Sequence, residues 1–398
     1  MKSQVLKNLI YSTLIFLVNL TKIFILSLNL FINKRRKIES KTLLIVRTDR
    51  IGDYVLFRNF LEKIKISTKY KDYKITLIGN SDWIFLSKNL DKDYIDDFIS
   101  INTKSFTFNF FYRLIKMREI TSKGYEVVLN AVSSRDFIIS DSIVKVLSSN
   151  KKIGFHTEAI NSSIANLKKS NSFYSELISI PNDITFEFER NKNFYQKFLD
   201  IDLNNIKPKI NLSDTKNPII LPKKYALLCI EAGHKSRIWN TKNFVEVASH
   251  IQKKFDYEIV LCGSSSKLSL RLAGDFKKNF EGRVYNFVGK TSIMELCYIV
   301  SSSSLILSNE TSVPHIAVAL SASNIFVISN GNQFGRFTPY PKKYSTSYNL
   351  ILHPKIEKDL NFFYYLVHQN KKSSVLNIND ISPEKVKVMI DKNLKLID

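Results

Sequence analysis

The chain has 398 residues, a formal net charge of +23 and a pI of about 9.6. This length is enough for two domains with complete hydrophobic cores. The excess of Lys and Arg indicates anionic partners: a phosphorylated donor, an acidic lipid or an anionic glycolipid. Because no basic helix, zinc-binding spacing or RNP-like strand accompanies the charge, nucleic acid is not expected as a partner. The three cysteines form no CxxC pair and are expected to be small buried hydrophobes.

The amino-terminal segment is apolar over residues 5–32, which is long enough to cross a bilayer. Lys7, Asn19 and Lys22 interrupt it and, at helical spacing, fall on one polar stripe, which favours a helix lying in the membrane interface. A spanning helix and a soluble packing helix remain alternatives. The basic run at 33–37 would hold anionic headgroups and keep the rest of the chain cytoplasmic. We therefore predict a membrane-associating helix and basic run over residues 1–40, which attach a cytoplasmic protein to the inner membrane.

Residues 41–205 alternate short apolar runs with amphipathic segments, which predicts a parallel sheet covered by helices on both faces. The expected strands are Thr42–Arg47, Lys74–Gly79, Glu126–Ala131 and Lys152–Phe155. The expected helices are Tyr54–Ile66, Asp82–Asn89, Phe106–Ser122, Asp136–Leu147 and Asp183–Asp200.

The stretch Asn204–Pro222 is polar and carries three prolines, which predicts a domain boundary. The alternation then starts again and predicts a second α/β domain over residues 206–398. Its expected strands are Tyr225–Ile230, Glu258–Cys262, Val284–Val288, Leu305–Ser308 and Asn324–Ser329. Its expected helices are Thr241–Phe255, capped by Thr241, Lys267–Asn279, one opened by a capping box at Ser292–Glu295, and Ser382–Leu396.

Two strand-to-helix turns carry polar side chains. After Leu305–Ser308, Thr311 is expected to cap a helix whose first turn contains Pro314. Glu310, Thr311, Ser312 and His315 then lie at the carboxyl end of a strand, where open α/β sheets bind ligands. The alternative is an ordinary turn with a good cap.

The other turn is TDRIGD at residues 48–53, which follows the first strand and precedes a helix. Asp53 stands at the start of that helix. Its carboxylate is placed either to serve chemistry in a cleft or simply to stabilise the helix start.

Four segments resemble glycosyltransferase family 9, the family of the lipopolysaccharide heptosyltransferases. TLLIVRTDRIGDYVLFRNFL is similar to its amino-terminal motif, and SNETSVPHIAVAL to its Asp-Thr-Gly-x-x-His motif. EAGHKSRIWNTKNFVEVA resembles its segment with a basic residue before Trp, and GRFTPYP its later Arg-containing loop. The four occur in the family's order.

This resemblance implies the GT-B arrangement, with two Rossmann-like domains facing a cleft: an acceptor domain over residues 41–205 and a nucleotide-sugar donor domain over residues 206–398. It implies that Asp53 is the general base and that Arg336 reaches the donor or the phosphates of the acceptor. Arg237 is the expected phosphate ligand, with Lys235 an alternative that the spacing cannot separate from it. The remaining residues that it places at the donor are Glu310, Thr311, Ser312 and His315. Glu310 stands where the family usually has Asp, and Ser312 where it usually has Gly.

The resemblance further implies an inverting transfer that needs no cofactor and no metal. The donor is expected to be a nucleotide diphosphate sugar similar to ADP-heptose. The acceptor is expected to be the lipopolysaccharide core or another lipid-linked glycan. The alternatives are a non-catalytic protein with the GT-B shell and a GT-B enzyme with a different donor. The segments Asp91–Asp93 and Asp200–Asp202 match the Asp-x-Asp pattern of metal-dependent GT-A transferases. Neither follows a strand in the way that a metal site requires.

Overall fold

The computed structural model describes residues 36–157, 162–212, 219–361, 363 and 374–394. The helix predicted within residues 1–35 lies outside these ranges. Within them, no helix is long and apolar enough to cross a bilayer.

The first half of the chain forms a six-stranded parallel sheet with the order β3-β2-β1-β4-β5-β6. Its strands are β1 Ile38–Arg47, β2 Lys74–Asn80, β3 Asp97–Ile101, β4 Gly124–Asn130, β5 Ser149–Phe155 and β6 Glu176–Ile178. Its helices are α2 Ile51–Val55, α3 Asn59–Ile66, α4 Ile84–Leu90, α5 Thr103–Phe108, α6 Phe110–Ile120, α7 Ser140–Val146, α8 Ile164–Asn171 and α9 Glu187–Leu199.

The second half forms another six-stranded parallel sheet, with the order β12-β11-β10-β7-β8-β9. Its strands are β7 Tyr225–Cys229, β8 Glu258–Leu261, β9 Val284–Asn286, β10 Leu305–Asn309, β11 Ile325–Ser329 and β12 Tyr348–Leu352. Its helices are η1 Lys235–Arg237, α10 Thr241–Phe255, α11 Lys267–Asn279, α12 Ile293–Ser301, α13 Val313–Ala319, α14 Pro354–Lys358, η2 Ile378–Asp380 and α16 Pro383–Asn393.

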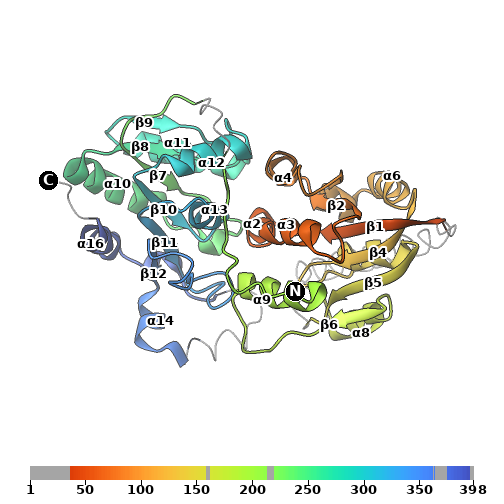
Figure 1. Cartoon of the computed structure of the whole chain (residues 1–398). Helices are drawn as coiled ribbons and strands as arrows, with labels where there is room; N and C mark the ends of the chain where they lie inside the picture. Colours follow the sequence, from red (N-terminus) through yellow and green to blue (C-terminus); the bar gives the residue numbers. More distant parts are fainter. Residues whose placement is uncertain (1–35, 158–161, 213–218, 362, 364–373, 395–398) are drawn as a thin grey trace, which may run out of the picture.

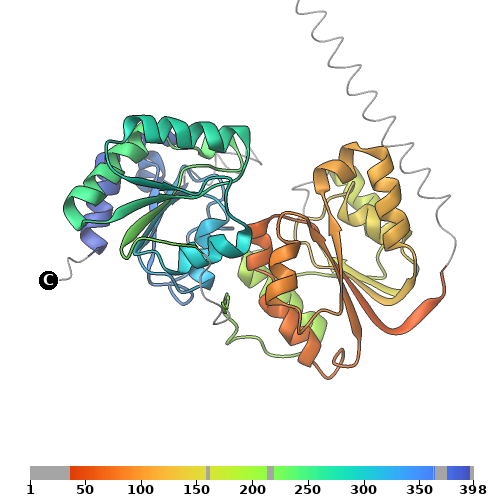
Figure 2. The same ribbon diagram turned by 90° about the horizontal axis from the view of Figure 1, so that it is seen from above.

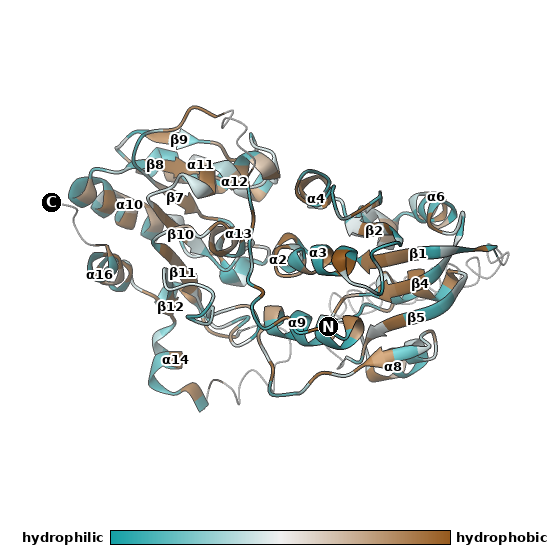
Figure 3. Ribbon diagram, viewed as in Figure 1, coloured by the Kyte–Doolittle hydropathy of each residue, from teal (hydrophilic) through white to brown (hydrophobic). Residues whose placement is uncertain are grey.

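The two sheets lie in separate lobes, joined by a connection that passes between them (Figure 1 and Figure 2). This confirms the predicted pair of Rossmann-like domains. The strands enter the core as the hydropathy pattern requires: β1 is polar and exposed at residues 39–41, is buried from Thr42 onward, and is apolar over residues 43–46 (Figure 3). One continuous hydrophobic cluster includes buried residues of both lobes, such as Tyr54 and Ile316. The lobes therefore share a packed interface.

Several predicted boundaries are wrong. The helix expected over 54–66 is two helices, α2 and α3, and the one expected over 106–122 is split at Asn109, which caps α6. Asn240 rather than Thr241 caps α10. Ser312 rather than Thr311 stands at the N-cap position of α13, but it is the hydroxyl of Thr311 that accepts a hydrogen bond from the backbone N–H of Val313, at 3.2 Å. The capping box of Ser292 and Glu295 is present as predicted.

All three cysteines are buried, and burial raises the pKa of each thiol. Their thiols therefore stay protonated at neutral pH. This agrees with the expectation that they act as small hydrophobes.

Candidate active site

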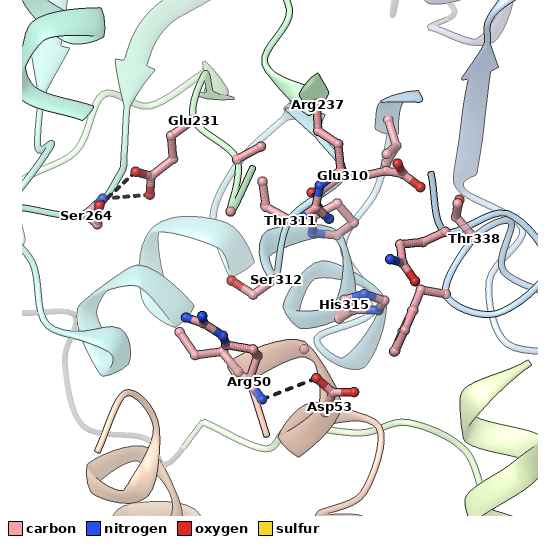
Figure 4. A pocket seen from close by; sticks show the side chains of 18 of the residues that line it. Arg50, Asp53, Glu231, Arg237, Ser264, Glu310, Thr311, Ser312, His315 and Thr338 are labelled. Atoms are coloured by element: carbon pink, nitrogen blue, oxygen red, sulfur yellow. Dashed lines mark hydrogen bonds between the residues drawn. The ribbon is translucent and has the colours of Figure 1, made fainter. Parts of the chain in front are cut away.

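A cavity of about 570 Å³ lies between the two lobes, where the carboxyl ends of both sheets face each other. The amino-terminal lobe lines it with Arg50, Ile51, Gly52, Asp53 and Asp82. The carboxyl-terminal lobe contributes the residues Glu231, Ala232, Gly233, Arg237, Ser264, Ser266, Leu268, Ser269, Glu310, Thr311, Ser312, Pro314, His315, Val327, Gln333, Phe337, Thr338 and Tyr348. Figure 4 shows Arg50 and Asp53 facing Ser312 and His315 from the opposite lobe. The sequence motifs thus meet at one cavity, as is general for ligand sites in open α/β sheets.

A buried arginine fixes the turn after β1. Arg47 is the last residue of β1 and is fully buried. Its Nε donates to Asp49 Oδ1 at 3.0 Å, and its Nη2 donates to the backbone carbonyl of Asp53 at 3.3 Å. Its Nη1 donates to Asn191 on α9 at 3.3 Å. Because these bonds span the whole turn, Arg47 holds Asp53 in place at the edge of the cavity.

Asp53 lies in the first turn of α2, and its carboxylate accepts a hydrogen bond from the backbone N–H of Arg50 at 3.3 Å. The side chain therefore does stabilise the helix start, and it also lines the cavity. Burial, and then the negative charge of Glu187, raise the pKa of Asp53, against the opposing attraction of Arg47 and Arg336. A carboxylate with a raised pKa binds a proton more readily, which suits a general base.

His315 and Gly52 touch across the lobe interface. A Cβ atom added to Gly52 would lie 2.8 Å from Cδ2 of His315, so only glycine fits in this packing. The Nδ1 atom of His315 lies 2.6 Å from the hydroxyl of Tyr340. Burial lowers the pKa of His315 to about 4, so the ring is neutral at physiological pH. His315 is therefore a packed, polar part of the cavity wall.

The turn between β10 and α13 supplies a buried carboxylate. Glu310 is buried, and both of its carboxylate oxygens lack a hydrogen-bond partner of good geometry among the described residues, although the side chain of Ser329 and the backbone N–H of Gln333 lie nearby. Burial raises the pKa of Glu310 to about 7, although Arg237 pulls it down. A carboxylate left this way is placed to receive hydrogen bonds from a ligand. It makes no hydrogen bond to His315, which instead meets Tyr340.

Arg237 and Lys235 are separated by the structure. Arg237 lines the cavity, and its Nη1 donates to the backbone carbonyl of Glu310 at 3.3 Å. Its Nε is buried and has no partner among the described residues. Lys235 is exposed and lies outside the cavity wall. Trp239 fixes this loop, because it is fully buried and its backbone N–H donates to Asn309 at the end of β10.

Sequence reasoning missed a polar corner of the cavity. Glu231, which follows β7, accepts hydrogen bonds from the backbone N–H and the hydroxyl of Ser264 at 2.7 and 2.8 Å, and from the hydroxyl of Ser269. Ser264 follows β8, and Ser269 lies in α11. Because β7 and β8 are neighbours in the sheet, the residues that follow them come together. No local sequence pattern predicts that β7 and β8 pair.

Arg50 is the second residue that sequence reasoning missed. Its side chain is 82% exposed and lies 3.6 Å from the carboxylate of Asp82. Its positive charge lowers the pKa of Arg237, after the larger effect of burial. Two cationic groups from opposite lobes therefore act on each other across the cavity.

Arg336 does not line the cavity. Its Nε donates to Glu187 Oε2 at 3.0 Å, and its Nη2 donates to Ser133 at 3.2 Å. Both partners belong to the amino-terminal lobe. In this arrangement its side chain joins the lobes.

The first Asp-x-Asp match is a structural feature. Asp91 is fully buried and accepts hydrogen bonds from Arg58 at 2.8 Å and from the hydroxyl of Tyr54. In the part of the chain that the structure describes, no group of three or more His, Cys, Asp or Glu side chains is arranged to hold a metal ion.

Two facing Rossmann-like lobes with a polar cavity between their strand ends define the GT-B class of fold. The family model of glycosyltransferase family 9 (heptosyltransferase) matches residues 113–360. The chain therefore belongs to glycosyltransferase family 9, and it is a nucleotide-sugar glycosyltransferase. A comparison with curated protein sequences found no match.

Solved structures agree with this fold at low sequence identity. The ADP-heptose lipopolysaccharide heptosyltransferase II of E. coli has a TM-score of 0.62 and 13% identity, covering 88% of this chain and 98% of its own. E. coli heptosyltransferase WaaC, solved with ADP-2-deoxy-2-fluoro heptose, has a TM-score of 0.62 and 14% identity, covering 89% and 100%. A family 9 glycosyltransferase from Veillonella parvula has a TM-score of 0.61 and 14% identity, covering 90% and 99%.

Proposed function

We propose that this glycosyltransferase moves a heptose from an ADP-heptose-like donor to the lipopolysaccharide core or another lipid-linked glycan, with inversion at the anomeric carbon. The observation that carries the proposal is the pairing of Asp53 and Arg237 at one cavity from opposite lobes. One group can take a proton from the acceptor and the other can hold the departing diphosphate. The family and two of the similar structures support the choice of sugar.

The donor diphosphate is proposed to lie between Arg237 and Arg50. The buried, unpartnered Nε of Arg237 can donate to a phosphate oxygen, and charge-assisted bonds of this kind are among the stronger ones in proteins. The hydroxyls of Thr311 and Ser312, which line the same wall, can donate as well. An anion at this point also relieves the repulsion between the two arginines. The site thus offers donors to a diphosphate without calling on a metal ion.

The sugar and the ribose are proposed to occupy the acidic parts of the cavity. Glu310 has two buried oxygens available to hydroxyl groups, and a negative diphosphate would be repelled there. Glu231, Ser264 and Ser269 form a corner of the cavity that can exchange hydrogen bonds with a diol such as that of a ribose. Carboxylates and hydroxyls are the usual hydrogen-bond partners of polyols, so the sugar and the ribose are both placed beside acidic side chains.

Asp53 is proposed to accept the proton of the acceptor hydroxyl as the oxygen attacks the anomeric carbon. The bond to the diphosphate breaks on the opposite face, which inverts the configuration. General-base assistance of this kind contributes about 10²–10⁴ in rate.

The acceptor and the location are proposed from the sequence. The apolar segment at 5–32 and the basic run at 33–37 are proposed to hold the protein on the cytoplasmic face of the inner membrane, close to a lipid-linked acceptor. Washing membranes with alkaline carbonate should release the chain if this segment lies in the interface and retain it if the segment spans. Recovery of the untreated chain in the soluble fraction would contradict the membrane proposal.

Turnover of a panel of nucleotide sugars by the purified full chain tests the function. We expect release of nucleoside diphosphate from ADP-heptose in the presence of a lipopolysaccharide-core acceptor, and an inverted anomer in the product by NMR. The rate should persist in EDTA. Transfer from a different donor alone would replace the sugar assignment, and a retained anomeric configuration would contradict the mechanism.

A further inference from the structure

An apolar patch lies on the outside of the amino-terminal lobe. Phe108, Phe111 and Ile115 are 75%, 73% and 64% exposed, and we call them the outer patch. Phe108 ends α5, while Phe111 and Ile115 are four residues apart on α6 and so share one face. Single exposed apolar side chains are ordinary, but neighbouring ones mark contact surfaces.

The outer patch is not needed for the core and is held rigidly. The opposite face of α5 and α6 packs into the lobe through Phe106, Met117 and Ile120, which are fully buried. Arg113, also buried, donates to the backbone carbonyl of Phe106 at 3.2 Å and to Ser142 on α7 at 2.8 Å. The α5–α6 pair therefore presents its aromatic side chains on a fixed support.

Positive charge surrounds the outer patch. Lys104 and Arg118 are exposed at its two ends. Arg36 and Lys37, the end of the basic run, are exposed as well, and Arg36 Nε donates to the backbone carbonyl of Thr121 at 3.2 Å, just after α6 ends. Glu119, an acidic residue on α6, is paired with Lys116 at 2.8 Å.

The position of α5 and α6 leaves the cavity open. Strands of a parallel sheet end at the same edge, so α5, which follows β3, starts from the edge that also carries Asp53. Figure 1 shows α6 on the side of the amino-terminal lobe that faces away from the other lobe. A surface touching the outer patch would therefore not cover the active site, yet would contact the lobe whose Asp53 is proposed to take the proton of the acceptor.

We propose that the outer patch rests on an anionic lipid bilayer, with Phe108, Phe111 and Ile115 among the headgroups and the surrounding Lys and Arg side chains on lipid phosphates. Aromatic and aliphatic side chains on a basic helix face are the usual composition of such contacts. This contact is additional to the amino-terminal segment. It deepens the proposed function in one respect, because it orients the lobe toward a membrane acceptor.

A tryptophan probe at position 111 of the full chain tests the proposal. Trp83 and Trp239 are fully buried, so a new surface tryptophan is easily distinguished. The Phe111→Trp variant is mixed with vesicles of anionic phosphatidylglycerol whose acyl chains are brominated. We expect its emission to shift to the blue and to be quenched. The Val388→Trp variant, which places the probe at an exposed site on α16 of the other lobe, should show neither change.

Charge reversal supplies the second arm. Arg118→Glu in the Phe111→Trp background should weaken the quenching, by about fivefold for each unit of charge removed. Zwitterionic vesicles should also quench less than anionic ones. An unquenched probe at position 111 in vesicles that carry the bound chain, or equal quenching at position 388, would overturn the proposal.

Two controls keep the outcomes separate. A blue shift that depends on protein concentration without lipid would assign the outer patch to a second copy of the chain and overturn the bilayer proposal. Turnover on a water-soluble acceptor fragment is measured in the same samples. Absence of that turnover in the unmodified protein would count against the proposed function. The quenching result would still decide whether the outer patch contacts the bilayer.

Discussion

Glu187 and Arg336 join the two lobes by both their side chains and their backbones. Arg336 Nε donates to Glu187 Oε2 at 3.0 Å, and the backbone N–H of Glu187 donates to the carbonyl of Arg336 at 2.8 Å. Glu187 opens α9 of one lobe, and Arg336 lies in the loop after β11 of the other. Because Glu187 is buried and also faces Arg47, this contact links the lobe interface to the turn that carries Asp53.

Removing Arg336 should destabilise the fold in a pH-dependent way. Arg336→Ala leaves the buried carboxylate of Glu187 short of its nearest cation, and breaking a buried pair costs about 3 kcal/mol. The pKa of Glu187 in the folded protein is lowered from 4.5, mainly by Arg336 against the cost of burial. The pair therefore stabilises the protein fully above pH 4.5, and this contribution is lost as the pH falls through the folded pKa.

Thermal melting measures this effect. The melting temperature of Arg336→Ala should lie well below that of the wild type at pH 7, and the gap should narrow below pH 4.5. Arg271→Ala, which removes an exposed arginine from α11, serves as the control and should melt like the wild type. An equal gap at every pH would show that Glu187 is not the partner that matters.

Arg237 and Lys235 should differ sharply in their effect on the donor. A charge-assisted phosphate contact is worth about 1.5–3 kcal/mol, so Arg237→Ala should raise the donor KM by about 10–150-fold. If the contact is equally strong in the ground and transition states, kcat should change little. Lys235→Ala is the matched control and should behave as the wild type, because the lysine is exposed outside the cavity. The reverse outcome would assign the role to Lys235.

Arg50 should bind the donor from the other lobe. Arg50→Ala should raise the donor KM without lowering the melting temperature, because the side chain is largely exposed and its ion pair with Asp82 lies at 3.6 Å. The effect should weaken at high salt, since an exposed charge is screened. Arg271→Ala again gives the comparison for loss of an exposed arginine. An unchanged donor KM at low salt would remove Arg50 from the donor site.

The contact between Gly52 and His315 makes a prediction of unusual sign. Alanine normally stabilises a helix relative to glycine by about 0.5–1 kcal/mol. In α2, however, the added Cβ would lie 2.8 Å from the His315 ring, so Gly52→Ala should lower the melting temperature. Once the ring is removed, in the His315→Ala background, the same change should be neutral or stabilising. Destabilisation of equal size in both backgrounds would show that His315 is not the obstacle.

The sequence predicts the parts of this molecule that depend on local patterns. Buried strands such as β7 and β10 are continuous apolar runs. The turn at Asp53 is predicted by its glycine and by the helical pattern that follows. The missed strands β3, β6 and β12 carry weaker signals: β3 is DFISI and only partly buried, β6 has three residues, and β12 is YNLIL with one fully buried position. Their strand character depends on pairing with a neighbour in the sheet.

The site was predictable to the same degree. Asp53, Arg237 and Glu310 belong to motifs and do line one cavity, whereas Arg336 belongs to a motif and pairs with a residue 149 positions away. Glu231 and Ser264 meet only because β7 and β8 are adjacent. Such long-range pairings are set by strand order, which no single segment encodes.

The steady-state turnover of Asp53→Asn, beside its donor affinity by calorimetry, tests the central claim most directly. Asparagine keeps the size of the side chain and can still cap α2, but it cannot accept the proton. We predict that kcat falls by about 10²–10⁴ while donor affinity and melting temperature stay near those of the wild type. In the wild type, kcat should rise with pH on the acid side, through a pKa above the ordinary 3.8 of an aspartate. Near-normal turnover in Asp53→Asn would contradict the assignment of Asp53 as the general base.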